Sequence, residues 1–149
     1  MLATELEALN AIAWAAKSHW GYPAAWMELW RDDLTLQPEH LNQMRIEVAE
    51  ANHVPLAWIA WQSHPNYWEI EHLWVHPTHH RKGLGKQLFS HGLQRYIPSQ
   101  ADIRVVADPN AIPFYEKLGF CMFEQLPSKI PGRVLPFMQR KPESSHSLL

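Results

Sequence analysis

Residues 73–89 read Leu73-Trp74-Val75-His76-Pro77-Thr78-His79-His80-Arg81-Lys82-Gly83-Leu84-Gly85-Lys86-Gln87-Leu88-Phe89. The stretch predicts an apolar strand that stops at Pro77, a basic turn with two glycines, and an amphipathic helix. Such a turn can direct several backbone N–H groups at one point, and the helix adds the positive end of its dipole. The stretch is therefore a candidate site for a phosphorylated ligand, although the glycines could also serve only a tight connection.

The sequence on either side of this turn predicts the remaining elements. Helical spacing, a Thr4 cap and Pro23 as an opening residue predict helices over residues 4–18 and 24–32. Alternation of apolar and polar residues predicts strands before the turn over residues 44–50, 54–63 and 67–75. After the turn we expect a helix over 83–97, a strand over 103–107, a helix over 109–118 that Asp108 caps and Gly119 ends, and strands over 120–126 and 133–139.

Length and composition predict one domain over residues 1–140, followed by a disordered tail over 141–149. The net charge of −2 provides no basic field, so we expect no nucleic-acid partner. The single Cys121 lies among apolar neighbours and predicts a buried thiol in a reducing compartment. The N-terminus lacks the charge pattern of a signal peptide, and no apolar run approaches the roughly 20 residues of a membrane span. A cytoplasmic protein without a membrane partner is the expectation.

Two common phosphate-binding loops do not fit the turn. A Walker A loop needs glycine where His80 stands, and serine or threonine where Gln87 stands. A dinucleotide-binding loop needs a third glycine at the position of Leu88. The phosphorylated ligand therefore belongs to another class.

A second motif follows the turn and reads Asp108-Pro109-Asn110-Ala111-Ile112-Pro113-Phe114-Tyr115-Glu116-Lys117-Leu118-Gly119-Phe120. Together the two segments resemble the GNAT superfamily of acyl-CoA-dependent N-acyltransferases. Residues 17–22 and 128–133 resemble one bacterial branch of small, mostly uncharacterised members of this superfamily. The family pattern Gln/Arg-x-x-Gly-x-Gly/Ala maps onto residues 80–85, with His80 in the place of Gln or Arg. The later pattern Asn-x-x-x-x-Tyr-x-x-x-Gly-Phe maps onto residues 110–120 without a departure.

The resemblance implies an α/β fold of the α+β type. Its mixed, mostly antiparallel central sheet would have about six strands and four flanking helices. The usual first strand is missing or truncated, because only Met1 to Ala3 precede the first predicted helix. The strand over 44–50 would then be a sheet edge and could serve as a homodimer surface.

Acetyl-CoA is the cosubstrate that the resemblance implies. The oxyanion of the reaction would lie near the backbone N–H of Leu73, and the backbone of Val75 would pair with the pantetheine arm. The strand would have to separate from its parallel neighbour over 103–107 to admit this arm. The other cofactor-binding residues would be His80, Arg81, Lys82, Gly83, Leu84, Gly85, Lys86, Asn110 and Tyr115.

Transfer to a primary amine requires a base, because an alkylammonium with a pKa of about 10 is protonated at neutral pH. Glu69 and Glu71 alternate onto one face of their predicted strand, and either could act directly or through water. Glu71 is the preferred candidate because it lies nearer the implied thioester position, and His72 is a third option. A solvated strand face is the structural alternative. Tyr115 would donate a proton to the departing thiolate, as the resemblance implies, or would be an ordinary core tyrosine.

The acceptor amine stays open between a polyamine, an aminoglycoside, an amino acid and a peptide terminus. Trp20 and Tyr22 lie between the first two predicted helices and could hold an ammonium by cation–π contact. Arg133 could recognise an acceptor carboxylate or only pair at the surface. We expect no metal site, because the histidines at 72, 76, 79 and 80 span Pro77 without a ligating cysteine. The alternative to an enzyme is a module that binds acyl-CoA without turnover.

Overall fold

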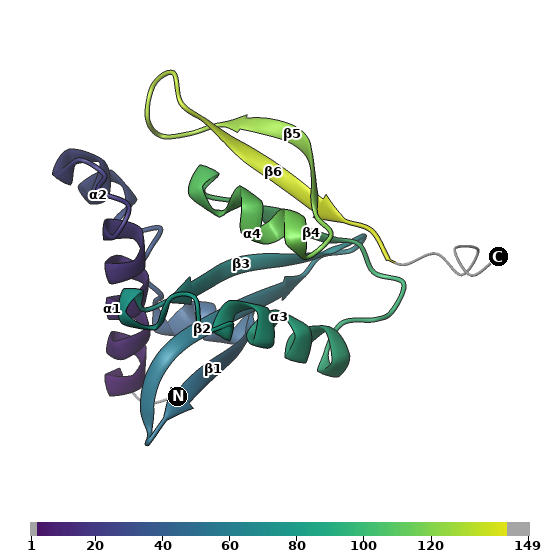
Figure 1. The fold of residues 1–149 in the computed structure, drawn as a ribbon, viewed down its shortest axis with the longest axis horizontal. Coiled ribbons are helices and arrows are strands. Elements are labelled where there is room, and N and C mark those ends of the chain that lie inside the picture. The colour runs from purple at the N-terminus through teal and green to yellow at the C-terminus, as the bar shows by residue number, and fades with distance from the viewer. Residues whose placement is uncertain (1–2, 143–149) are drawn as a thin grey trace. The chain divides into compact units, whose positions relative to one another are not determined.

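The computed structural model describes residues 3–142, which divide between two compact units. Among the described residues, unit 1 consists of residues 3–61 and His72–Ser90, and unit 2 of Gln62–Glu71 and residues 91–142. The strands have the order β1-β2-β3-β4-β6-β5 in a mixed, mostly antiparallel sheet (Figure 1). The predicted six strands and four helices are therefore confirmed.

Unit 1 contains the N-terminal helices, the first sheet edge and the glycine turn. Its elements are α1 (Ala3–Ser18), α2 (Ala24–Trp30), the 3₁₀ helix η1 (Pro38–Asn42), β1 (Arg45–Ala51), most of β2 (Val54–Ser63), the second half of β3 (Trp68–Val75), the 3₁₀ helix η2 (Pro77–His79) and the first half of α3 (Leu84–Arg95). The buried Trp58 ring on β2 ties this strand to α1, because its Nε1 donates a hydrogen bond of 2.8 Å to the Leu9 carbonyl. Trp61 packs on Phe89 of α3 with a centroid separation of 5.7 Å. These large apolar side chains form the core of the unit.

A tight turn connects β1 and β2. Its two central residues, Asn52 and His53, have φ angles of 52° and 65°. Positive φ at both positions gives the backbone twist that suits a two-residue hairpin. The strands then pair antiparallel from Ala51 with Val54 to Arg45 with Trp61.

Unit 2 contains the C-terminal strands and the second motif. Its elements are the first half of β3, β4 (Ile103–Val106), the 3₁₀ helix η3 (Pro109–Ala111), α4 (Ile112–Lys117), β5 (Cys121–Pro127), β6 (Val134–Arg140) and the remainder of α3. Strand β4 pairs parallel with β3 and antiparallel with β6, and β5 and β6 form an antiparallel pair (Figure 1). The core of the unit is made by Ile70, Ile103, Val105, Phe120 and Met138, all at most 3% exposed.

Several sequence predictions need correction. Helix α2 ends at Trp30 and not at residue 32, Thr4 lies inside α1 and is not its cap, and η1 was not predicted. Cys121 is exposed and not buried, and so are Met122 and Phe123, which follow it on β5. The predicted tail beyond residue 142 lies outside the described residues.

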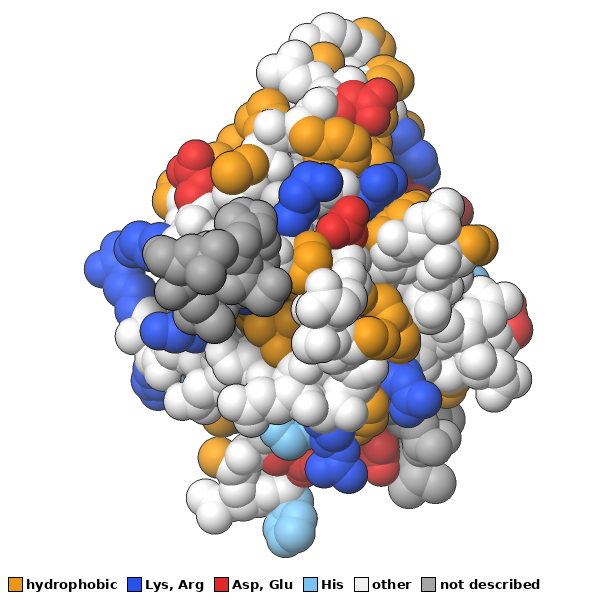
Figure 2. All heavy atoms as spheres, turned by 90° about the vertical axis from the view of Figure 1, so that its right-hand side faces the viewer, with side chains coloured by type: hydrophobic (Ala, Val, Ile, Leu, Met, Phe, Trp, Pro, Cys, Tyr) orange, Lys and Arg blue, Asp and Glu red, His pale blue; other side chains and the backbone are white. Residues whose placement is uncertain are grey.

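Three features of the described residues concern the expected partners: the surface charge, the length of the helices and the position of β1. On the face that Figure 2 shows, Lys and Arg side chains lie among acidic and hydrophobic ones and do not form one continuous basic area. Among residues 3–142, no helix is long and apolar enough to cross a membrane. Strand β1 is at the end of the strand order, as its predicted edge position requires.

Candidate active site

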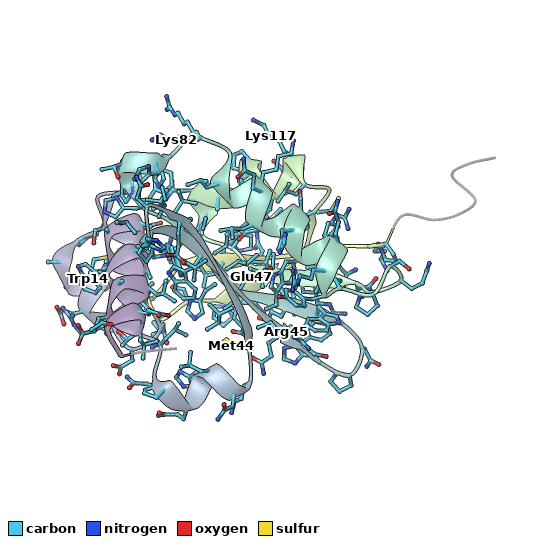
Figure 3. All side chains as sticks on the ribbon, turned by 90° about the horizontal axis from the view of Figure 1, so that it is seen from below. Trp14, Met44, Arg45, Glu47, Lys82 and Lys117 are labelled. Atoms are coloured by element: carbon cyan, nitrogen blue, oxygen red, sulfur yellow. The ribbon has the colours of Figure 1, made fainter. Side chains whose placement is uncertain are left out.

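The glycine turn reverses the chain between η2 and α3. Arg81 and Gly83 have φ angles of 66° and 78°, a backbone region that glycine adopts at little cost and arginine adopts rarely. The Lys82 side chain extends away from the turn, and its Nζ lies 3.0 Å from Nδ1 of His79 (Figure 3). Burial lowers the pKa of His79, and the charge of Lys82 adds to this effect.

Six consecutive backbone N–H groups in this turn have no acceptor within residues 3–142. They belong to residues 81–86, between the bond from His80 N–H to the Pro77 carbonyl and the bond from Gln87 N–H to the Gly83 carbonyl. An α-helix leaves its own first N–H groups unpaired, and here the preceding turn adds several more. Unpaired donors of this kind, with the helix dipole behind them, are suited to a phosphate or pyrophosphate.

His80 joins the turn to the end of β3. Its Nε2 lies 2.9 Å from the carbonyl oxygen of Val75. The ring also meets that of His19 edge-on at 4.9 Å and stacks on Trp20 at 6.5 Å. The position at which the sequence departs from the family pattern therefore fixes the first residues of the turn through its side chain.

Glu69 and Glu71 lie on one face of β3, in unit 2, together with His64. Nε2 of His64 lies 2.9 Å from Oε1 of Glu69, which is ion-pair distance, although the direction of the ring N–H does not make a hydrogen bond. Burial and the neighbouring Glu69 carboxylate raise the pKa of Glu71, whose side chain nevertheless reaches solvent. The exposed edge of Glu71 and its raised proton affinity are the properties of a general base.

The three side chains offer ligand atoms that lie within 4.8 Å of one another. This spacing suits a shared proton as well as a cation, and exposed acidic groups often lie together without a metal. The histidines that the sequence raised as metal candidates have other partners. Nδ1 of His76 accepts from the Thr78 N–H, in addition to the contacts of His79 and His80 described above.

His72 is not suited to act as a base. Burial, with a smaller contribution from His40, lowers its pKa to about 4. Its Nδ1 accepts a hydrogen bond of 3.1 Å from the Trp74 indole, and its ring packs against Trp58 at 5.0 Å. His72 is thus a neutral core residue at physiological pH.

The second motif, in unit 2, contains the N-cap of η3 and a buried tyrosine. Oδ1 of Asp108 accepts hydrogen bonds from the backbone N–H and from the side-chain amide of Asn110, at 2.8 and 3.0 Å. Tyr115 is 5% exposed and meets Phe114 and Phe120 edge-on, at 5.0 and 5.3 Å. Burial raises the pKa of Tyr115, so its hydroxyl keeps its proton across the physiological range.

The predicted acceptor residues differ in their surroundings. Trp20 is 44% exposed. The Tyr22 ring already has a cation of this chain beside it, because Nζ of the buried Lys17 lies 5.1 Å from its centroid and 4.4 Å from that of Trp30. Arg133 is half-buried, and its backbone closes the turn between β5 and β6 through bonds with Ser128 and Ile130.

Sequence reasoning missed Arg104 on β4. Its Nε donates a hydrogen bond of 2.9 Å to Oε1 of Gln139, and its guanidinium carbon lies 4.2 Å from the Tyr67 ring and 5.2 Å from the Phe123 ring. These partners come from three separate segments of unit 2, so no local motif could have identified the cluster.

The expected site residues divide between the units. The turn, Leu73, Val75, Trp20 and Tyr22 belong to unit 1, whereas Glu69, Glu71, Asn110, Tyr115 and Arg133 belong to unit 2. Strand β3 contributes to both, and Glu71 precedes Leu73 by two residues along it. In unit 2, β3 and β4 pair through Trp68 with Ile103, Glu69 with Arg104 and Ile70 with Val105.

Comparison with known protein families identifies the class to which the chain belongs. The model of the acetyltransferase (GNAT) family matches residues 6–120, and the chain therefore belongs to this family. It is an acyltransferase that takes an acetyl group from acetyl-CoA as its cosubstrate. No curated protein matches the sequence.

Solved structures share the fold at low sequence identity. The PaiA N-acetyltransferase of Thermoplasma acidophilum, solved with coenzyme A, is 18% identical over 95% of each chain, with a TM-score of 0.71. A GCN5-related N-acetyltransferase of Rhodopseudomonas palustris is 20% identical over 95% of this chain and 92% of its own, with a TM-score of 0.75. The ribosomal-protein-S18-alanine N-acetyltransferase of Escherichia coli is 20% identical over 100% of this chain and 96% of its own, with a TM-score of 0.67.

Proposed function

We propose that this protein transfers the acetyl group of acetyl-CoA to a primary amine of a small molecule or peptide, by direct attack within a ternary complex. The unpaired N–H groups of residues 81–86 carry this proposal, because they offer an anion-binding turn directly after β3. We assign the CoA pyrophosphate to this turn and the pantetheine arm to the backbone of Val75. We also assign Asn110, in unit 2, to cofactor binding, because it matches the family pattern.

The amine must first lose a proton. Glu71 takes this proton, directly or through a water molecule, and its raised pKa increases its affinity for it. Glu69 lies beside Glu71 and, by its negative charge, contributes to that raised pKa. The amine nitrogen then attacks the thioester carbon, and negative charge develops on the carbonyl oxygen.

The oxyanion and the leaving group each require a donor. We assign the backbone N–H of Leu73 to the oxyanion, a kind of contact whose loss typically costs about 100-fold in rate. When the carbon–sulfur bond breaks, Tyr115 gives its proton to the thiolate. The nitrogen of the tetrahedral intermediate then releases its surplus proton, which returns to Tyr115 through water, and the amide product and CoA leave. Because burial raises the pKa of Tyr115, the phenol is protonated when it is needed.

Thermal unfolding with CoA and acetyl-CoA tests the cofactor site first. A ligand at 100 times its Kd stabilises the folded state by about 2.7 kcal/mol. We expect a clear rise in Tm with both ligands, and CoA release when a panel of amines is added. No shift at millimolar CoA would refute the assignment, and binding without turnover on a broad panel would instead favour an acyl-CoA sensor.

A further inference from the structure

The guanidinium of Arg104 is a partly buried cation without an anionic partner among residues 3–142. Its Nε is used by Gln139, and the Tyr67 and Phe123 rings lie against it at 4.2 and 5.2 Å. No described residue accepts a hydrogen bond from its two terminal nitrogens. A guanidinium against aromatic rings keeps its edge free, and this edge matches a carboxylate in a bidentate arrangement.

The nearest acidic side chain in the sheet register does not neutralise Arg104. Glu69 is its partner in the parallel pairing of β3 and β4, so the two Cα atoms are about 5 Å apart across the strands. The Glu69 carboxylate nevertheless contacts His64, and Arg104 turns to Tyr67 and Gln139. The partly buried guanidinium therefore keeps its two terminal nitrogens available to an anion from outside the chain.

Both signs of charge thus occur on one face of unit 2. Glu69 and Glu71 lie on one face of β3 by alternation, and Arg104 of β4, the register partner of Glu69, lies on the same face of the sheet. A molecule with a cationic and an anionic group complements this arrangement better than a simple amine or a polyamine, whose second positive charge would face Arg104.

From this geometry we propose that Arg104 binds a carboxylate of the acceptor, so that the acceptor is an amino acid-like molecule with a primary amine and a carboxylate. The inference rests on the proposed acetyl transfer and narrows its acceptor. The acceptor amine lies at Glu71, and its carboxylate accepts hydrogen bonds from the terminal nitrogens of Arg104. Tyr67, Phe123 and Gln139 hold the guanidinium in place.

Matched acceptors that differ only in the carboxylate test the proposal. Lysine is compared with cadaverine, γ-aminobutyrate with butylamine, and phenylalanine with its amide, by CoA release at saturating acetyl-CoA. We expect the carboxylate member to be preferred in kcat/KM by about 10- to 100-fold, the size of a lost hydrogen bond to a charged group. Equal turnover of both members of every pair would overturn the inference and leave the proposed acetyl transfer standing. No turnover with any amine would overturn both.

Variants of Arg104 test whether this residue causes the preference for acceptors with a carboxylate. Arg104→Gln should raise the acceptor KM for the carboxylate member about 10- to 100-fold, remove the preference within each pair and leave the KM of acetyl-CoA unchanged. Arg104→Lys keeps the positive charge but loses the planar guanidinium. Its acceptor KM for the carboxylate member should lie between that of the wild type and that of Arg104→Gln. Arg95→Gln is the matched control, because Arg95 is an exposed arginine near the Tyr96 ring, at 5.7 Å. An equal loss on both members of a pair in folded Arg104→Gln would contradict a role in carboxylate binding.

Discussion

Nε2 of His80 lies 2.9 Å from the carbonyl oxygen of Val75. His80 occupies the position at which the family pattern has glutamine or arginine. The contact fixes the start of the anion-binding turn relative to the last residue of β3. We predict that His80→Ala raises the KM of acetyl-CoA about fivefold, the effect of losing one ordinary hydrogen bond. His80→Gln keeps a donor and should stay near the wild-type value. Steady-state kinetics check this prediction, and identical KM values in all three proteins would show that the contact does not support the turn.

Gly83 and Gly132 provide a matched pair of glycines. Their φ angles are 78° and 79°, and an added Cβ at either position would meet no atom within 4 Å. Alanine at either site should therefore cost a similar amount of stability, about 1–2 kcal/mol, from the left-handed backbone alone. Only Gly83→Ala should also weaken CoA binding, because it shifts the N–H groups of residues 81–86. Calorimetric titration with CoA separates the variants, and an equal change in Kd would count against the turn as the pyrophosphate site.

Glu71→Gln should remove most of the activity, by about 100-fold or more in kcat, because the base is lost. In the wild type, kcat should fall as the pH drops through the raised pKa of Glu71. Glu116 on α4 is exposed, so Glu116→Gln is a control whose kcat and pH dependence should equal those of the wild type. A pH–rate profile that is unchanged in Glu71→Gln would exclude Glu71 as the base.

The raised pKa of Glu71 also predicts a stability effect. Between its unfolded and folded pKa values the native state binds more protons than the unfolded state, so the free energy of unfolding falls as the pH rises through this interval. Glu71→Gln should therefore be more stable than the wild type at neutral pH and gain nothing at acidic pH below the unfolded pKa. Urea unfolding at two pH values measures this difference, which should have the opposite sign to the effect on activity.

Tyr115→Phe keeps the ring that packs on Phe114 and Phe120 and removes only the hydroxyl. We predict a fall in kcat of about 100-fold, because general acid catalysis is lost, with little change in Tm. The loss should be smaller with an acetyl thioester whose thiol is more acidic, because that leaving group depends less on a proton. A uniform loss with all donors would indicate that Tyr115 only packs.

Local patterns in the sequence predicted the strands and most helices well, because side chains point to alternate faces of a strand and return to the same face of a helix every third to fourth residue. The Asn52-His53 hairpin and the cap at Asp108 also depend on neighbouring residues only. The exposed Cys121 was misjudged, because its apolar neighbours do not reveal whether anything covers a strand face. Arg104 could not be found in this way. Its partner Gln139 lies 35 residues away and reaches it only because β6 pairs with β4.

The anion-binding turn offers main-chain donors, which every residue except proline possesses whatever its side chain. Recognition of this kind is indifferent to much of the local sequence and depends on the path of the backbone. Substitutions at Lys82 or Lys86 should consequently be tolerated more readily than a change at Gly83, whose φ angle few other residues adopt. A histidine can then replace the residue type typical of the family without loss of the turn, so long as the chain still bends at the same place.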